Sequence, residues 1–210
     1  MTPITQSILR NAIGLGLFAV ITAGSIALTQ SVTADRIDEQ IRRAEAAALF
    51  EIIPPSRHDN DLLNDIVALP DSFRLGHRMP AEGHIARQAG QPVGIILPVV
   101  TPEGYSGDIR LLVGISTTGE LLGVRVTNHR ETPGLGDRVE LKKSNWILAF
   151  DGRGLTDERT RWAVRKDGGS FDQFTGATIT PRAVVQAVYE ALRFFEDHGE
   201  SLLAMPAPSV

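Results

Sequence analysis

The sequence predicts an α+β protein, with one N-terminal transmembrane helix followed by a domain that has an antiparallel sheet and flanking helices. Three observations predict this fold class. Residues 11–29 carry no charged side chain, residues 92–126 show apolar runs separated by turns, and residues 180–199 repeat apolar side chains at helical spacing. These patterns are typical of a membrane span, an antiparallel meander and an amphipathic helix, respectively.

The uncharged run over residues 11–29 is just long enough to cross a bilayer, because about 20 apolar residues span one as a helix. A cleaved signal peptide is the alternative, since residues 32–34 form a small-residue cleavage pattern and Arg10 precedes the run. We favour a retained anchor, because the run is longer than the usual signal core. Arg10 alone precedes the run, whereas three arginines follow it by residue 43, so a charge count does not support export.

Apolar spacing and turn residues divide the rest of the chain. A helix is expected from Ala34 to Ile53, ended by Pro54, and a short helix is expected over Asp61–Val67. We therefore divide the chain into a cytoplasmic N-terminus (1–10), a transmembrane helix (11–29), a helical connecting region (30–91), the main domain (92–200) and a flexible tail (201–210).

The main domain begins with an antiparallel meander, because β-branched and alternating apolar residues fill short runs that turn sequences separate. Three strands are predicted, at residues 93–100, 109–115 and 122–126. Residues 137–150 are expected to be irregular to helical, with aromatic residues at core-like spacing. A further strand is predicted at residues 161–165, followed by an Asp-Gly hairpin turn at residues 166–169.

The last helix has the clearest boundaries in the sequence. Thr180 is the expected N-cap, with Pro181 at N1 and Ile179 placed to form a hydrophobic staple with Val184. Gly199 is the expected C-terminal stop. Apolar side chains recur on one face and predict a buried stripe of Val184, Val185, Val188, Leu192 and Phe195.

The composition excludes several classes of function. With no cysteine in 210 residues, the chain has no disulfide, thiolate metal site or catalytic thiol. A net charge of −4 with scattered basic residues argues against nucleic-acid binding. The histidines lack metal-ligand spacing, and they are His58, His77, His84, His129 and His198. A redox function would therefore need a bound cofactor.

The clearest chemical motif runs from Asp172 to Thr180, a small-residue loop that leads into the last helix. Backbone N–H groups and the positive end of the helix dipole favour a phosphate there. Gly176 and Ala177 let a bulky group approach the backbone, and the Thr178 hydroxyl is able to form a phosphoester. Taken alone, these properties favour an ordinary Ser/Thr-rich turn before a capped helix, because such turns are common.

A second segment, His129 to Gly136, contains the turn residues Pro133 and Gly134. Its glycines let the backbone approach a flat ring. Considered by itself, the segment is more simply interpreted as a plain β-turn. Its weight increases because the same chain also contains Thr-Gly-Ala-Thr at residues 175–178.

Together the two segments resemble the FMN-binding domain family. Residues 172–178 match its Asp-x-x-(Ser/Thr)-Gly-Ala-Thr flavinylation motif, and residues 131–136 match its Glu-Thr-Pro-Gly-Leu-Gly loop. In that family a separate transferase moves FMN from FAD onto the last threonine of the motif, which here is Thr178. The resemblance thus implies that residues 92–200 bind FMN, covalently, through a phosphoester to Thr178.

The resemblance also implies roles for neighbouring residues. Asp172 matches the leading acid of the motif, while Thr175, Gly176 and Ala177 match positions that the transferase reads. Residues expected to surround the ring and the phosphate are Glu131, Thr132, Leu135 and Thr175. We expect no catalytic residue and no metal site, because the flavin would carry out the redox chemistry.

Within this family the chain is similar to the G subunit of Rnf-type ion-translocating electron-transport complexes, most specifically over residues 105–188. The resemblance implies a flavoprotein subunit that relays electrons in a ferredoxin/NAD(H) oxidoreductase complex and is not catalytic alone. The implied partners are the other membrane subunits and, during maturation, a flavin transferase. The implied location is the bacterial inner membrane, with the domain on the periplasmic side of a single span.

Two alternatives remain open from the sequence. The C subunit of the sodium-translocating NADH:quinone reductase would use the same flavin and anchor, but it typically has a larger external domain than this chain of 210 residues allows. The other alternative is an exported ligand-binding or scaffold domain without a cofactor. Yellow colour that survives denaturation would exclude the cofactor-free alternative, and co-purifying subunits would distinguish the two flavoproteins.

Overall fold

The computed structural model describes residues 3–157 and 160–207 of the chain. The chain divides into two compact units, residues 1–44 and residues 45–210. The first unit is formed by helix α1 (Pro3–Ile52), whose last turns belong to the second unit. The expected helix over residues 34–53 is confirmed as the end of α1, and the prolines that follow Ile53 end it.

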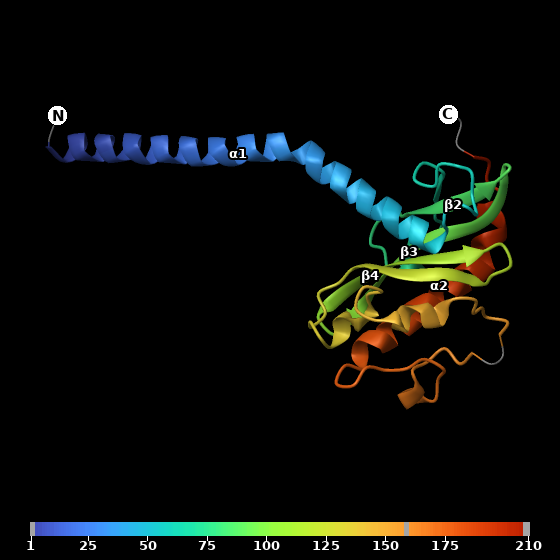
Figure 1. Ribbon diagram of the computed structural model, residues 1–210. Helices are drawn as coiled ribbons and strands as arrows, with labels where there is room; N and C mark the ends of the chain where they lie inside the picture. Colours follow the sequence, from blue (N-terminus) through green and yellow to red (C-terminus); the bar gives the residue numbers. More distant parts are fainter. Residues whose placement is uncertain (1–2, 158–159, 208–210) are drawn as a thin grey trace. The chain divides into compact units, whose positions relative to one another are not determined.

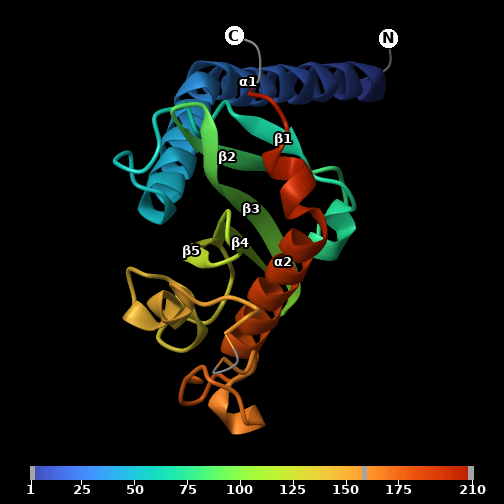
Figure 2. The same ribbon diagram turned by 90° about the vertical axis from the view of Figure 1, so that its right-hand side faces the viewer.

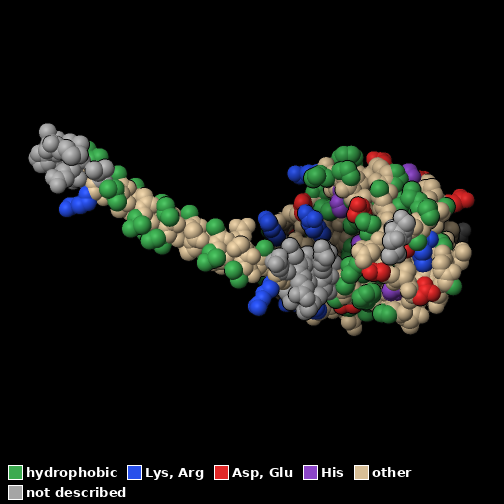
Figure 3. Space-filling model, turned by 90° about the horizontal axis from the view of Figure 1, so that it is seen from above, with side chains coloured by type: hydrophobic (Ala, Val, Ile, Leu, Met, Phe, Trp, Pro, Cys, Tyr) green, Lys and Arg blue, Asp and Glu red, His purple; other side chains and the backbone are tan. Residues whose placement is uncertain are grey.

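One helix among the described residues is long and apolar enough to cross a membrane. It covers Arg10–Ala34 of α1, with a mean hydropathy of 2.0 and no burial within the protein. Figure 3 shows apolar side chains along this part of the helix. The expectation of a helix over residues 11–29 is therefore confirmed, and these exposed apolar side chains suit a lipid environment.

The second unit is built on one five-stranded sheet, in which every neighbouring pair is antiparallel and the order follows the chain (Figures 1 and 2). The strands are β1 (Ile66–Ala68), β2 (Glu82–Gln88), β3 (Gln91–Gly104), β4 (Gly107–Ser116) and β5 (Leu121–Asn128). The predicted three-stranded meander is confirmed as β3, β4 and β5, and the fold class is α+β as expected.

The prediction of a short helix over Asp61–Val67 is wrong. Asp61 accepts hydrogen bonds from Leu63 N at 3.1 Å and Asn64 Nδ2 at 2.7 Å, which favours a turn over a helix. The chain then enters β1, so the stretch expected to be a helical connection contributes β1 and β2 to the sheet.

A helix covers each face of the sheet. Helix α2 (Ile179–Leu203) packs on one face and buries the larger apolar cluster (Figure 2). On the other face, Ile52 at the end of α1 packs so closely that a methyl group on Gly114 of β4 would lie 2.2 Å from it. The apolar stripe predicted for the last helix is buried as expected.

Irregular chain joins β5 to α2. It contains the 3₁₀ turns η2 (Gly136–Val139), η3 (Asn145–Phe150) and η4 (Arg165–Asp167). Residues 137–150 are irregular to helical as predicted, with Ile147 and Phe150 fully buried.

The strand predicted at residues 161–165 does not form. Val164 makes a single bridge to Phe171, and η4 begins directly after it. Phe171 also stacks on Phe150 with ring centroids 4.5 Å apart, so this segment bonds to itself around an aromatic cluster. Gly168 has φ +80°, which agrees with the predicted turn, but no hairpin forms there because the bridge between Val164 and Phe171 is parallel.

The predicted ends of α2 need correction. Thr178 is its N-cap, and the helix continues through Gly199 to Leu203 because Leu202 is buried and extends the apolar face. Ile179 is 46% exposed at the first helical position, so the expected hydrophobic staple is absent. Thr180 is not a cap, because its hydroxyl donates to a buried carboxylate.

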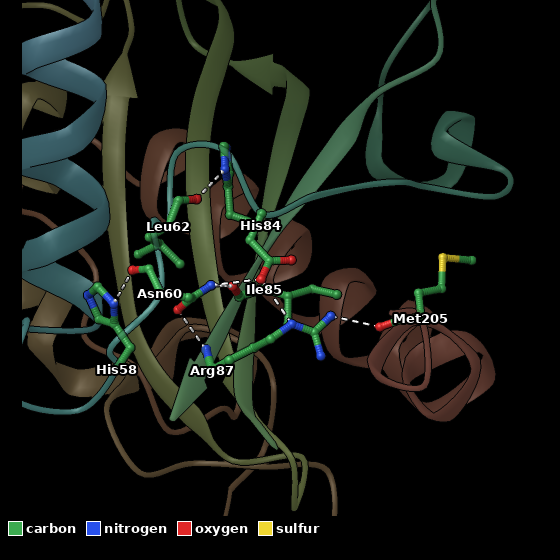
Figure 4. Close-up of polar contacts among 8 residues, drawn as sticks. His58, Asn60, Leu62, His84, Ile85, Arg87 and Met205 are labelled. Carbon is green, nitrogen blue, oxygen red and sulfur yellow. Dashed lines mark hydrogen bonds and ion pairs between the residues drawn. The ribbon is translucent and has the colours of Figure 1, made fainter. Parts of the chain in front are cut away.

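A buried polar network holds residues 58–65 and the chain end to β2 (Figure 4). Arg87 Nε donates to Asp65 Oδ2 at 2.9 Å, and Arg87 Nη2 donates to Met205 O at 2.7 Å. Asn60 Nδ2 donates to Asp65 Oδ2 at 2.8 Å, while Asn60 Oδ1 accepts from Arg87 N at 2.8 Å. At this edge of the sheet, hydrogen bonds satisfy the buried charges of Asp65 and Arg87, where other parts of the sheet bury apolar side chains.

Candidate functional site

Three segments far apart in the sequence meet at the start of α2, and the Glu131 side chain joins them. Glu131 is 4% exposed. Its Oε1 accepts from Ser106 N, in the β3–β4 turn, at 2.9 Å. Its Oε2 accepts from the Thr180 hydroxyl, in the first turn of α2. We call these three residues and their two hydrogen bonds the Glu131 bridge.

The loop that carries Glu131 is a close-fitting turn. Leu135 N and Gly136 N both donate to Thr132 O at 3.1 Å, and Gly134 has φ +78°. The turn predicted at residues 133–134 is therefore confirmed. The Thr132 side chain faces solvent and Leu135 is 41% exposed, so the loop presents both side chains outward.

His129 fixes the start of this loop. Its Nδ1 accepts from Glu131 N at 3.0 Å, and its Nε2 lies 2.6 Å from Glu140 Oε1. Because Nδ1 accepts a hydrogen bond from the backbone, Nε2 carries the ring hydrogen and donates to Glu140. His129 therefore holds the backbone of Glu131, while the carboxylate holds the other two segments.

The motif at residues 172–178 is attached to the domain through Phe174 and Asp172. Phe174 is buried, with the Trp146 ring centroid 5.1 Å from its own and the Arg138 guanidinium 5.2 Å above it. Asp172 O accepts from Trp146 Nε1 at 2.7 Å, and the Asp172 carboxylate pairs with Arg165 at 3.0 Å. These contacts leave the residues after Phe174 free to turn outward.

The motif ends in a tight turn before the helix. Ala177 N donates to Phe174 O at 3.1 Å, and Gly176 between them has φ +83°, a conformation that favours glycine. Thr175 and Gly176 are exposed, while Ala177 and Thr178 are half-buried. A methyl group added at Gly176 would lie 3.5 Å from Leu135 Cδ2, so the two motif segments are in contact here.

Thr178 occupies the N-cap position of α2, but its side chain makes no capping hydrogen bond. The first turn of α2 carries no acidic residue, and Pro181 within it lacks an N–H group. The N–H groups of Ile179 and Thr180 therefore remain at the positive end of the helix dipole. A phosphate on the Thr178 hydroxyl would lie next to them.

An exposed ion pair ties η4 to the same turn of α2. Arg182 Nε and Nη2 donate to Asp167 Oδ2 and Oδ1 at 2.7 and 2.9 Å. These hydrogen bonds lower the pKa of the Asp167 carboxyl below its ordinary value and raise the pKa of the Arg182 guanidinium. Arg182 is thus occupied by a carboxylate and adds little net positive charge near Thr178.

The structure brings most of the sequence-predicted residues to one place and separates one of them. The Leu135 side chain lies beside Gly176, and a hydrogen bond joins Glu131 to the first turn of α2, directly after Thr178. Asp172 instead turns toward Arg165. Sequence reasoning missed the roles of Ser106, Thr180 and His129. His129 had a sequence signal, since it stands two residues before Glu131 in the same loop, and Ser106 lies in a segment, Gly104–Gly107, that also resembles the FMN-binding family.

Comparisons with known proteins agree with this geometry. The FMN-binding domain family matches residues 104–193, and the RnfG N-terminal region matches residues 1–52. The G subunit of the ion-translocating oxidoreductase complex of Pseudomonas aeruginosa PAO1 is 52% identical, over 95% of this chain and 94% of the relative. The chain belongs to the G-subunit family of ion-translocating oxidoreductase complexes.

Two further relatives, also G subunits, align over the same length. The protein of Shewanella loihica is 47% identical over 96% of both chains, and that of Vibrio cholerae O395 is 44% identical over 96% of this chain and 97% of the relative. The family resemblance inferred from the motifs is thereby confirmed. The FMN-binding match includes all three segments joined by the Glu131 bridge.

The residues at the start of α2 fit an FMN phosphate. The Thr178 hydroxyl makes no capping hydrogen bond, the adjacent helix N–H groups favour an anion, and the exposed Gly176 has no side chain to cover the backbone. The exposed apolar side chain of Leu135 lies beside Gly176 and offers a surface for a flat ring.

Proposed function

We propose that this member of the G-subunit family carries one FMN as a phosphoester on Thr178 and relays electrons through it. The complex that contains it would couple electron transfer between ferredoxin and NAD(H) to ion transport. The observation that carries the proposal is the Thr178 hydroxyl, which makes no capping hydrogen bond at the start of α2. Thr178 also lies within the residues that match the FMN-binding domain family. The bound flavin would supply the redox chemistry, because the chain has no cysteine and its side chains offer no obvious electron carrier.

Attachment occurs once, during maturation, and uses a separate flavin transferase with FAD as the donor. Thr178 Oγ1 forms a bond to the phosphorus of the FMN half of FAD, and the anhydride bond from that phosphorus to AMP breaks. AMP leaves, the hydroxyl proton passes to the transferase or solvent, and no electron is transferred. The exposed Thr175 and Gly176 and the partly exposed Ala177 are accessible for the transferase to recognise.

The residues around Thr178 hold the attached group rather than react with it. The N–H groups of Ile179 and Thr180 stabilise the phosphate charge at the helix end. Leu135 would offer an apolar surface to the ring, and the exposed Thr132 and Thr175 would supply hydroxyls from the two loops that carry Leu135 and Gly176. Asp172 serves in recognition by the transferase, since its carboxylate is exposed and paired with the exposed Arg165.

The chain is held at the inner membrane by the apolar part of α1, with its domain in the periplasm. Its partners are the other membrane subunits of the complex. The relatives, which are G subunits, favour this function over the alternative of a quinone reductase C subunit. The FMN-binding match argues against a scaffold domain without a cofactor.

The substitution Thr178→Val tests the proposal, because it keeps the shape of the side chain and removes the hydroxyl. When it is co-expressed with an active flavin transferase, the chain without substitutions should gain the mass of one FMN less one water. The Thr178→Val variant should gain no mass. The free energy of unfolding should change by no more than about 0.5 kcal/mol, since the hydroxyl makes no capping bond. Intact mass and in-gel flavin fluorescence after denaturation measure attachment.

Thr178→Ser is the matched control, because it retains a hydroxyl and should still be flavinylated. Fluorescence that persists in Thr178→Val would place the attachment on another residue, with Thr175 tested next. Thr180→Val is not a neutral control, because the Thr180 hydroxyl belongs to the Glu131 bridge. If the chain without substitutions gained no flavin in the presence of an active transferase, the proposal would be wrong.

A further inference from the structure

The Glu131 carboxylate lies in a cradle that leaves no space for extra atoms. A methyl group on Gly136 would lie 2.7 Å from Glu131 Oε2, and one on Gly104 would lie 2.9 Å from Glu131 Oε1. Thr180 is fully buried beside it. The fit is thus set by backbone on two sides and by the first turn of α2 on a third.

Both carboxylate oxygens already have a donor from a different segment. Ser106 N donates to Oε1 at 2.9 Å, and the Thr180 hydroxyl donates to Oε2. A buried carboxylate that accepts one hydrogen bond on each oxygen cannot reorient without breaking those hydrogen bonds, which is costly in free energy. The two hydrogen bonds of Glu131 therefore hold the β3–β4 turn and the first turn of α2 against the loop that carries Glu131.

Thr180 is only two residues from Thr178, in the same turn of α2. Fixing the Thr180 side chain fixes the rotation and position of that first turn, since both residues share its backbone. The Thr178 side chain makes no capping bond of its own, so the backbone of this turn, which fixes the Cα–Cβ bond and limits the side-chain rotamers, sets the positions that its hydroxyl can take. The direction of the Thr178 hydroxyl therefore depends on where the bridge places the turn.

We propose that Glu131 is a positioning residue for flavin attachment: through Thr180 it holds the Thr178 hydroxyl where the transferase can join it to the FMN phosphorus. This inference rests on the proposed function of Thr178. Orientation of a nucleophile is worth large factors in rate, and misplacement by about 1 Å can cost on the order of a hundredfold. The effect should therefore appear in the rate of attachment and not only in stability.

A different role for Glu131 makes a different prediction. If its charge acted on the isoalloxazine ring, removing the charge would shift the flavin's potential and leave the attachment rate unchanged. The substitution Glu131→Gln removes the charge and keeps the side-chain shape: its amide oxygen can accept from Ser106 N, and its amide nitrogen can donate to the Thr180 oxygen, which then changes from donor to acceptor. Glu131→Ala and Thr180→Val each break the bridge, and Thr180→Val does so with little change of shape.

The experiment measures the rate of FMN attachment to the full chain by intact mass, with transferase and FAD in excess. Thr180→Val and Glu131→Ala should each be slower than the unmodified chain by about tenfold or more. The double variant should be no slower than the worse single variant, because both changes break one interaction. Thr180→Ser and Glu131→Gln should stay close to the unmodified chain.

Val188→Ala is the control for stability, since Val188 is a fully buried residue of α2 that is outside the bridge. It should lower the melting temperature and leave the attachment rate unchanged, with all variants assayed where circular dichroism shows them folded. The positioning role of Glu131 would be wrong if Thr180→Val gained FMN as fast as the chain without substitutions, or if Val188→Ala slowed attachment as much as Thr180→Val does. Either result would leave the proposed function of Thr178 intact. An unmodified chain that gains no FMN would remove the proposed function as well.

Discussion

Gly134 and Gly136 lie in the same turn, but the structure requires glycine at the two positions for different reasons. Gly134 has φ +78°, with open space where a side chain would project. Gly136 has no such conformation, and a methyl group there would lie 2.7 Å from Glu131 Oε2 and 2.8 Å from Thr180 Oγ1. Gly134 is therefore required for the backbone conformation of the turn, and Gly136 is required because the Glu131 bridge leaves no space for a side chain.

Alanine at each position should separate these roles. Gly136→Ala should lower the free energy of unfolding by about 1–3 kcal/mol through overpacking, and it should also slow FMN attachment because it displaces the bridge. Gly134→Ala should cost about 1–2 kcal/mol through backbone strain and leave attachment unchanged. Urea denaturation and the rate of mass gain measure the two effects. Equal attachment rates in the two variants would contradict this account.

The sequence suggested Thr178 as the candidate attachment residue, but it did not indicate the contact that Thr180 makes. Thr178 belongs to a contiguous motif, so its neighbours in the sequence are also its neighbours in the site. Thr180 precedes a proline, a pattern typical of an N-cap, and its true partner Glu131 is 49 residues away. A buried contact between two such distant side chains leaves no local pattern that residue spacing could reveal.

Strand β2 was not predicted because it carries a buried charged residue, and β1 (Ile66–Ala68) was missed because it is only three residues long. β2 (Glu82–Gln88) contains Arg87, which is 5% exposed and bonded within the network of Figure 4. Apolar alternation is the main signal of a half-buried strand, and a buried ion pair removes it. β3, β4 and β5 were predicted because their apolar residues form runs or alternate along the chain, and these residues belong to the larger buried cluster.

The buried ion pair between Asp65 and Arg87 should be essential for this edge of the sheet. Asp65→Ala would leave the Arg87 guanidinium buried without its carboxylate, and it should lower the free energy of unfolding by about 3–5 kcal/mol. Chemical denaturation measures the loss. Asp197→Ala is the control, since it removes a carboxylate from an exposed pair with Arg74 and should leave the midpoint unchanged.

The same pair of variants shows whether the network supports the sheet or only the chain end. Arg87 also donates to Met205 O, so a purely terminal role would affect only the last residues. If Asp65→Ala unfolded at the same denaturant concentration as the unmodified chain, the network would not stabilise β2. Similar losses in Asp65→Ala and Asp197→Ala would mean that burial does not decide the strength of these pairs.

The division between the two compact units falls inside α1, which continues without a break from Pro3 to Ile52. The sequence agrees with this continuity, because no turn residue separates the uncharged run from the helix that follows. It could not give the orientation in the membrane. Three arginines follow the run and one precedes it, so local charge opposes the export that the family implies.

We expect the chain to remain in the membrane at full length, with its C-terminus outside the cytoplasm. Cleavage after Ala34 would cut within α1, whereas the apolar segment Arg10–Ala34 is long enough to span a bilayer and is exposed. N-terminal sequencing and intact mass of the membrane-purified protein measure retention, and a reporter fused after Val210 measures the side. A chain that begins at Asp35 behind a cleavable signal is the control, and it should appear in the soluble periplasmic fraction. A native N-terminus at Asp35 would show that α1 is a signal, and a reporter active only in the cytoplasm would reverse the orientation.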